Sequence, residues 1–156
     1  MKLIKPSVEI WQQAPGMSGI YQQIERCARV CYKSEDKIGE GTAEKMVQML
    51  MEREHTAMLE HGTVYLYASN ETIEPCELDV YKYLENPYSK VLESITSNED
   101  ENTFYNHYFI TTNYRVIVEN GWQDDLEYLC RPTRHERRIT VHFVCDRGIS
   151  HKKFVA

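Results

Sequence analysis

The segment REHTAMLEHG, residues 53–62, is the densest collection of side chains that could do chemistry. It holds two histidines and two glutamates within eight positions, together with the hydroxyl of Thr56. His55 and His61 are six positions apart, whereas a zinc protease helix needs histidines four positions apart with a glutamate after the first. On a loop, the imidazoles, the hydroxyl and the Glu60 carboxylate could instead hydrogen-bond a polar ligand. A plain helix-to-strand turn is the alternative interpretation.

A second cluster is basic. The segment RPTRHERR, residues 131–138, contains four arginines and one histidine in eight positions. Guanidinium groups bind carboxylates and phosphates through paired hydrogen bonds, so this segment could hold an anionic ligand. The simpler interpretation, which we favour from the sequence, is a solvated turn whose charges are offset by the nearby acidic segment QDDLEY.

A third and weaker candidate is Asp146–Gly148, which follows a strand-like segment near the end of the sequence. A glycine turn that leads into a helix can present backbone N–H groups to an anion, although the same residues are equally compatible with an ordinary turn. The sequence has no phosphate-cradling glycine loop, no serine-protease constellation and no signature of a nucleophilic cysteine. The residue types alone therefore indicate an anion or nucleotide site without a reaction.

The five cysteines include no CxxC pair. Cys27 and Cys31 lie one helical turn apart on an apolar stripe, so we interpret them as small core residues and expect no structural metal.

Composition and charge exclude several classes of protein. The 156 residues are 42% hydrophobic and 27% charged, which is ordinary for a globular domain. A net charge of −6 argues against a general nucleic-acid binder, because phosphate neutralisation needs a basic surface. No apolar run is long enough to cross a bilayer, and the N-terminus does not resemble a signal peptide. We therefore expect a cytoplasmic protein with neither nucleic acid nor membrane as a partner.

Two amphipathic helices are expected before the first cluster. Apolar residues recur at helical spacing from Ser18, a candidate N-cap, to Tyr32. Thr42 is expected to cap the second helix, which carries one apolar face formed by Ala43, Met46, Val47, Leu50 and Met51. A short strand is expected around residues 2–4.

Strand-like segments occupy much of the remaining sequence. Residues 61–69 alternate, with Val64 and Leu66 on one face. Residues 70–106 are polar and tyrosine-rich, so they are interpreted as an insertion with a helix near 78–84 followed by loops. The later elements expected are strand character from residue 108 up to a turn or helix start at Asn120–Gly121, a short helix over 122–130 and an alternating strand over 138–146.

These elements predict one fold class. Helices come early and the strands are scattered without a regular βαβ alternation, which favours a single α+β domain over residues 1–156, with helices packed on a mixed or antiparallel sheet.

The order of the segments resembles a known family. CARVCYKSEDK followed by EREHTAMLEHGTVYLY resembles the N-terminal region of flavin-dependent thymidylate synthase. NPYSKV, TTNYRV, DDLEYLC and RITVHFVCDRGISH are similar to versions of that enzyme with an insertion between strands, so the resemblance covers nearly the whole chain. It implies a thymidylate-synthase-complementing-protein fold and a homo-oligomer that uses FAD, NADPH and methylenetetrahydrofolate to methylate dUMP to dTMP.

The resemblance also implies roles for particular residues. Cys31, His55, Ala57 and Glu60 match positions that approach the flavin, and Arg147 lies in the turn that leads to the signature helix, where it is expected to bind substrate. Ala57 stands where a serine or threonine hydroxyl often contacts the cofactor, so one hydrogen bond would be missing. At the position of Cys31 the family often has a small polar side chain, and a thiol is a poorer hydrogen-bonding partner.

No catalytic residue can be carried over. The Arg-His-Arg signature of the family should begin shortly after the DRG segment, and it is absent from the sequence. The resemblance therefore implies that the C-terminal part of the fold is missing and that the chain alone is inactive.

Two alternatives remain. One is a non-catalytic oligomerisation module or nucleotide-binding protein on the same fold, and the other is a diverged enzyme that uses the arginines of residues 131–138 for anion contacts. A last strand without its covering helix would expose apolar surface and an edge, so we expect a dimer or larger oligomer.

Overall fold

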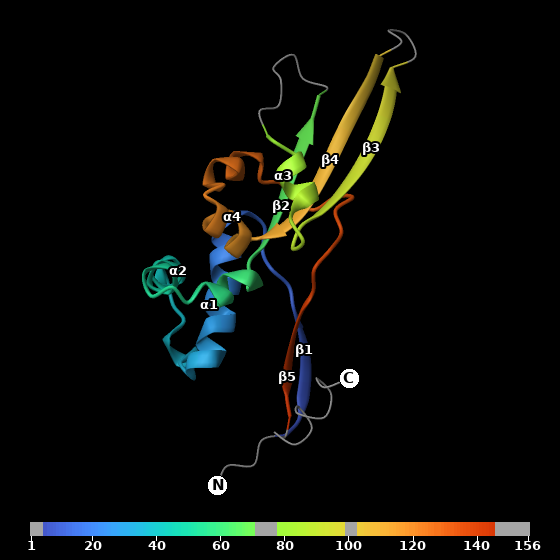
Figure 1. Cartoon of the computed structure of the whole chain (residues 1–156). Coiled ribbons are helices and arrows are strands. Elements are labelled where there is room, and N and C mark those ends of the chain that lie inside the picture. The colour runs from blue at the N-terminus through green and yellow to red at the C-terminus, as the bar shows by residue number, and fades with distance from the viewer. Residues whose placement is uncertain (1–4, 71–77, 99–102, 146–156) are drawn as a thin grey trace. The chain divides into compact units, whose positions relative to one another are not determined.

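The structure is a computed structural model that describes residues 5–70, 78–98 and 103–145 of the chain. Contacts divide the chain into two compact units, one formed by Met1–Gln12 with Arg138–Ala156 and the other by Gln13–Arg137 (Figure 1). The strand expected around residues 2–4, the Asp146–Gly148 turn and Arg147 lie outside the described residues.

The larger unit begins with helix α1 (Gly16–Tyr32), whose buried face includes Ile20, Ile24 and Ala28. The helix starts two residues before Ser18, with Pro15 at the N-cap, so the expectation that Ser18 caps it is wrong. Proline is compatible with this boundary because its φ angle is already close to the helical value. Helix α1 ends at Lys33, which adopts the left-handed conformation.

A short 3₁₀ helix, η1 (Glu35–Lys37), leads to helix α2 (Thr42–Glu52). Its apolar face is confirmed for Met46, Val47 and Leu50, which are buried. Thr42 is the first residue of α2 and not its N-cap: Gly41 occupies the cap with φ +68°, a value that glycine adopts readily.

The strand expected over residues 61–69 is confirmed as β2 (Thr63–Ser69), with Val64 and Leu66 fully buried. It belongs to a three-stranded antiparallel sheet of order β2–β4–β3, in which β3 (Lys90–Asn98) and β4 (Thr103–Asn113) pair from Lys90↔Thr111 to Asn98↔Thr103. The expectation of loops between residue 85 and residue 106 is therefore wrong. Much of β3 is exposed, so its polar composition hid the strand.

Between and after these strands lie α3 (Tyr81–Glu85), α4 (Tyr114–Asn120) and the 3₁₀ helix η3 (Gln123–Tyr128). Helix α4 corrects the prediction that strand character continues to residue 119. The Asn113 side chain accepts a hydrogen bond from the Val116 N–H and caps the helix. Gly121, in the left-handed conformation, terminates it, so Asn120–Gly121 marks a helix end.

The core of the larger unit lies between the sheet and its helices, as Figure 1 shows for α1, α2 and α4. Fully buried apolar side chains come from every one of these elements: Ile20, Ile24, Val47, Leu50, Val64, Leu66, Ile110 and Ile117. Burying a side chain of this size contributes about 1.5–3 kcal/mol. The core therefore fixes the short 3₁₀ helix η2 (Thr56–His61), which joins α2 to β2 and whose Leu59 is also fully buried.

The smaller unit contains strands β1 (Ser7–Trp11) and β5 (Thr140–Val144), paired antiparallel from Ser7↔Val144 to Trp11↔Thr140. Both units are thus built from antiparallel sheets, and the larger one adds the helices, so the predicted α+β class with an antiparallel sheet is confirmed. Within the described residues, every helix is too short or too polar to cross a membrane.

Candidate functional site

Three of the four residues proposed to approach a flavin lie on or beside η2. His55 immediately precedes this turn, and Ala57 and Glu60 belong to it. All three are exposed, whereas Leu59 points into the core. The turn arises because helix α2 ends at Arg53 and Glu54 adopts a left-handed backbone conformation with φ +56°. The N–H of His55 then donates to the Leu50 carbonyl at 2.9 Å, which turns the chain toward β2.

The fourth residue, Cys31, is on the last turn of α1 and is exposed. The interpretation of Cys31 as a core residue is therefore wrong, whereas Cys27 is buried as expected. Burial raises the pKa of the Cys27 thiol to about 11, so this thiol stays protonated at neutral pH.

Tyr32, next to Cys31, joins the end of α1 to η2. Its hydroxyl lies 2.8 Å from Nδ1 of His55, and the two rings are stacked with their centroids 6.5 Å apart. This contact brings the helix end that carries Cys31 to the start of the turn that carries Ala57 and Glu60. The proposed flavin residues are therefore held on neighbouring elements with their side chains open to solvent.

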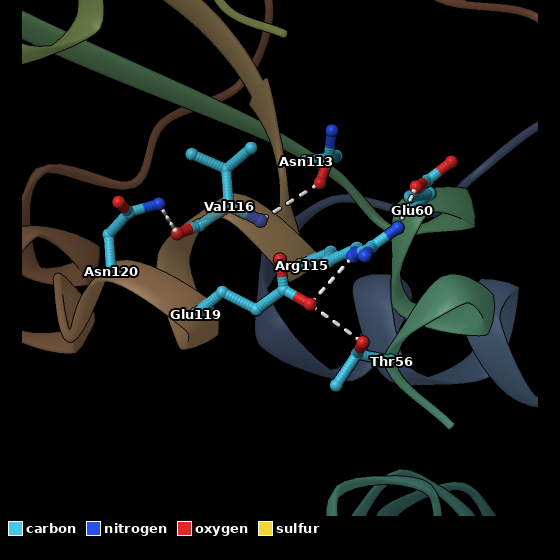
Figure 2. Close-up of polar contacts among 7 residues, drawn as sticks. All are labelled: Thr56, Glu60, Asn113, Arg115, Val116, Glu119 and Asn120. Carbon is cyan, nitrogen blue, oxygen red and sulfur yellow. Dashed lines mark hydrogen bonds and ion pairs between the residues drawn. The ribbon is translucent and has the colours of Figure 1, made fainter. Parts of the chain in front are cut away.

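Helix α4 holds the other end of the turn through Arg115. Figure 2 shows the Arg115 guanidinium between two carboxylates, with Nη1 2.5 Å from Glu60 and Nε 2.8 Å from Glu119. The same Glu119 oxygen accepts a hydrogen bond from the Thr56 hydroxyl at 2.7 Å. Arg115 and Glu119 thus connect α4 to both Thr56 and Glu60, at opposite ends of η2.

This network shifts the pKa values of two of its members, Glu119 and Arg115. The hydrogen bond from Thr56, followed by that from Arg115, lowers the pKa of the Glu119 carboxyl below its ordinary value. Hydrogen bonds to Glu119 and Glu60 raise the pKa of Arg115. These hydrogen bonds therefore favour the charged forms of both Glu119 and Arg115.

A polar pocket of about 340 Å³ adjoins this network. Its lining combines the charged groups with amides and one phenol: Glu60, Asn86, Tyr88, Asn113, Arg115, Val116, Glu119 and Asn120. Carboxylate, amide and guanidinium groups can offer both hydrogen-bond donors and acceptors to a polar ligand.

The basic segment contains a structural histidine. His135 is 5% exposed, and its Nε2 donates to the Leu66 carbonyl at 2.9 Å while Nδ1 accepts from the Thr133 N–H. Burial lowers the pKa of His135, which keeps the ring neutral. The segment thereby crosses the face of the sheet opposite the core, where Arg134 donates to Ser94 at 2.9 Å on β3.

The acidic segment QDDLEY has a different partner from the one expected. Its buried Asp125 lies 2.6 Å from Lys82 and accepts a hydrogen bond from Tyr83 at 2.5 Å, so α3 neutralises this carboxylate. Arg131, Arg134 and Arg137 remain exposed. The solvated-turn interpretation fits these arginines, but Asp125 does not offset them.

Sequence reasoning missed Tyr32, Arg115 and Glu119 as parts of the site. Arg115 and Glu119 are four positions apart, the spacing of a helical ion pair, and that signal was concealed because residues 114–119 were interpreted as strand.

Comparisons with known proteins identify no relative of this chain: no family model, curated protein or solved structure matches it. Among the described residues, no three histidine, cysteine, aspartate or glutamate side chains form a group that could hold a metal ion.

Proposed function

We propose that this chain is part of a flavin-dependent thymidylate synthase with an insertion between its strands, acting in the methylation of dUMP to dTMP. The observation that carries the proposal is the placement of the His-x-x-x-x-Glu-His segment on an exposed turn beside the end of α1. In the family that the sequence resembles, the corresponding residues approach the flavin. As part of the same proposal, the fold is of the thymidylate-synthase-complementing-protein type.

The donor set fits one part of FAD. His55 and Glu60 offer a ring nitrogen and a carboxylate on one exposed turn, which suit the polar edge of the isoalloxazine ring. Ala57 has no hydrogen-bonding side chain, and Cys31 has a weak one. The diphosphate requires cations, and Arg115 at this turn is already paired with two carboxylates.

When bound, the flavin would supply the electrons that reduce the transferred one-carbon group. In this proposal the residues of η2 only bind and orient the cofactor. Arg147 would contact dUMP, and the Arg-His-Arg signature, which the 156 residues do not contain, would complete both sites. NADPH and methylenetetrahydrofolate would be the co-substrates, and flavin and nucleotide would lie at the junctions of a homo-oligomer. We therefore expect weak FAD binding and no turnover by this chain alone.

A titration with FAD, followed by flavin fluorescence, tests the proposal. His55→Ala and Glu60→Gln should weaken binding, while Glu127→Gln, which removes an exposed carboxylate from η3, serves as the matched control. Equal affinity for all four proteins would contradict a flavin site at η2. Tritium release from labelled dUMP, with NADPH and methylenetetrahydrofolate present, should stay at background; measurable turnover would refute the incomplete site.

A second candidate function, a non-catalytic oligomerisation module, is favoured by a separate observation. Strands β1 and β5 carry two apolar cross-strand pairs, Val8↔Phe143 and Ile10↔Val141, whose side chains are 39–65% exposed. Contiguous exposed apolar side chains on a two-stranded ribbon are typical of an interaction surface. Val141→Lys should therefore reduce the mass measured by sedimentation if a second copy covers this face, and an unchanged mass would exclude it.

A further inference from the structure

We infer that Arg115 is a positioning residue that braces η2 in the conformation required for contact with the flavin. The expected effect on flavin binding rests on the proposed function, because the geometry of η2 matters for binding only if a ligand binds there. The contacts of Arg115 that brace η2 exist in the chain without a ligand. Arg115 forms its ion pairs with Glu60 and Glu119, so its effect on flavin binding would pass through the turn.

Helix α4 is a firm support for the turn. The backbone N–H of Tyr114 donates to the Gly62 carbonyl at 2.8 Å, directly after η2. The Tyr114 hydroxyl lies 3.0 Å from that of Tyr21 on α1, and Val116 and Ile117 are buried. Helix α4 is thus fixed both to the core and to the chain that follows the turn.

The turn η2 itself has few internal restraints on its exposed side. Its one fully buried residue is Leu59, whereas His55, Ala57 and Glu60 face solvent. A 3₁₀ helix has poorer hydrogen-bond geometry than an α-helix, so a six-residue example benefits from outside contacts. The contacts of Arg115 with Glu60 and of Glu119 with Thr56 supply them near both ends.

The orientation of the Glu60 carboxylate also depends on Arg115. Figure 2 shows it directed at the Arg115 guanidinium. Without Arg115 this half-exposed side chain would lose its ion pair, and Glu119 would place a like charge nearby. Exposed ion pairs are worth little to global stability, so the expected effect of Arg115 is on the geometry of η2 more than on folding.

The test compares Arg115→Gln, which keeps most of the side chain but removes the charge, with the conservative Arg115→Lys. Arg137→Gln is the matched control, because this exposed arginine belongs to the basic segment rather than to η2 or α4 and donates a long hydrogen bond, 3.4 Å, to the Pro132 carbonyl. Two quantities are measured on the full chain: amide hydrogen exchange of residues 55–62 without ligand, and the dissociation constant for FAD. Thermal unfolding identifies any variant that has lost its fold.

We expect exchange in residues 55–62 and the dissociation constant to rise about three- to twentyfold in Arg115→Gln, less in Arg115→Lys and not at all in Arg137→Gln. Unchanged exchange in a folded Arg115→Gln variant would overturn the brace. Faster exchange with unchanged FAD affinity would overturn the positioning role. If the wild-type chain binds no FAD, the proposed function fails, the positioning role fails with it, and exchange alone decides whether the brace exists.

Discussion

The Tyr32 hydroxyl lies 2.8 Å from Nδ1 of His55, although the two residues are 23 positions apart in the chain. The contact joins the last turn of α1 to the residue that opens η2. It leaves Nε2 as the ring nitrogen of His55 that is outside this hydrogen bond. A neutral imidazole has one donor nitrogen and one acceptor nitrogen, and the Tyr32 hydroxyl can pair with Nδ1 in either role.

Replacing Tyr32 with phenylalanine should therefore change the turn more than the fold. The hydrogen bond is exposed, so its loss should lower the free energy of unfolding by no more than about 0.5–1 kcal/mol. Nitrogen-detected NMR of the His55 side chain should show a changed balance of the two tautomers. An identical tautomer balance in Tyr32→Phe and the wild type would show that the contact has no influence on His55.

The Glu119 carboxyl predicts a pH dependence. Its pKa lies below the ordinary value of a glutamate in the folded chain, because Thr56 and Arg115 hydrogen-bond the charged form. The unfolded state thus binds more protons, so this contribution to stability is present above the ordinary glutamate pKa and disappears as the pH falls through the lower, folded value.

Urea unfolding of the wild type and Glu119→Gln from pH 3 to pH 7 measures this effect. The advantage of the wild type should be small, because the side chain is partly exposed, and it should be greatest near neutral pH. A difference that grows as the pH falls would have the wrong sign for the network in Figure 2.

Gly62 is predicted to be a position where a single methyl group is harmful. An added Cβ would lie 2.7 Å from Cδ1 of Ile24 and 2.8 Å from Cγ2 of Ile20, which are both buried side chains of α1. Gly62→Ala should therefore reduce the free energy of unfolding by about 1–3 kcal/mol, as overpacking does in other cores. Gly39→Ala, whose Cβ would come no closer than 3.9 Å to Thr42, is the control and should change stability by at most about 0.5 kcal/mol. Equal midpoints in urea for the two variants would contradict the close approach.

The Tyr83 hydroxyl should be among the most important polar groups for stability. Tyr83 is fully buried and donates to Asp125 at 2.5 Å. Burial, together with the bond to Asp125, raises the pKa of Tyr83, so the hydroxyl keeps its proton. Tyr83→Phe leaves the carboxylate with Lys82 and should cost about 1–3 kcal/mol in urea unfolding. Tyr81→Phe, at a side chain 76% exposed, should leave the midpoint nearly unchanged, and a similar loss in both would argue against a special role for Tyr83.

The sequence predicted an element correctly where apolar residues recur regularly along one face of that element. Helices α1 and α2 and strand β2 follow this rule, because each buries one regular face. It failed at α4, where Val116, Ile117 and Val118 suggest a strand and the Asn113 cap overrides their preference. The sequence also failed to predict β3, because its largely exposed residues do not alternate between apolar and polar as they would with one face buried.

The candidate site was predictable only as a set of side chains. His55, Ala57 and Glu60 lie within six positions of one another in the sequence, so their common turn could be foreseen. The partners that hold the turn could not, because Tyr32 and Arg115 reach it from distant elements. Tertiary contacts of this kind have no local signature in a single sequence.

An NMR titration of the isotope-labelled chain with FAD tests the central claim most directly, since it detects weak binding and locates it. Chemical shifts should move progressively for the amides of residues 55–61 and of Cys31, while those of residues 93–97 on β3, an outer strand of the sheet, stay in place. Saturating FAD that leaves residues 55–61 unperturbed, or that perturbs the arginine segment 131–137 instead, would contradict a flavin surface at η2.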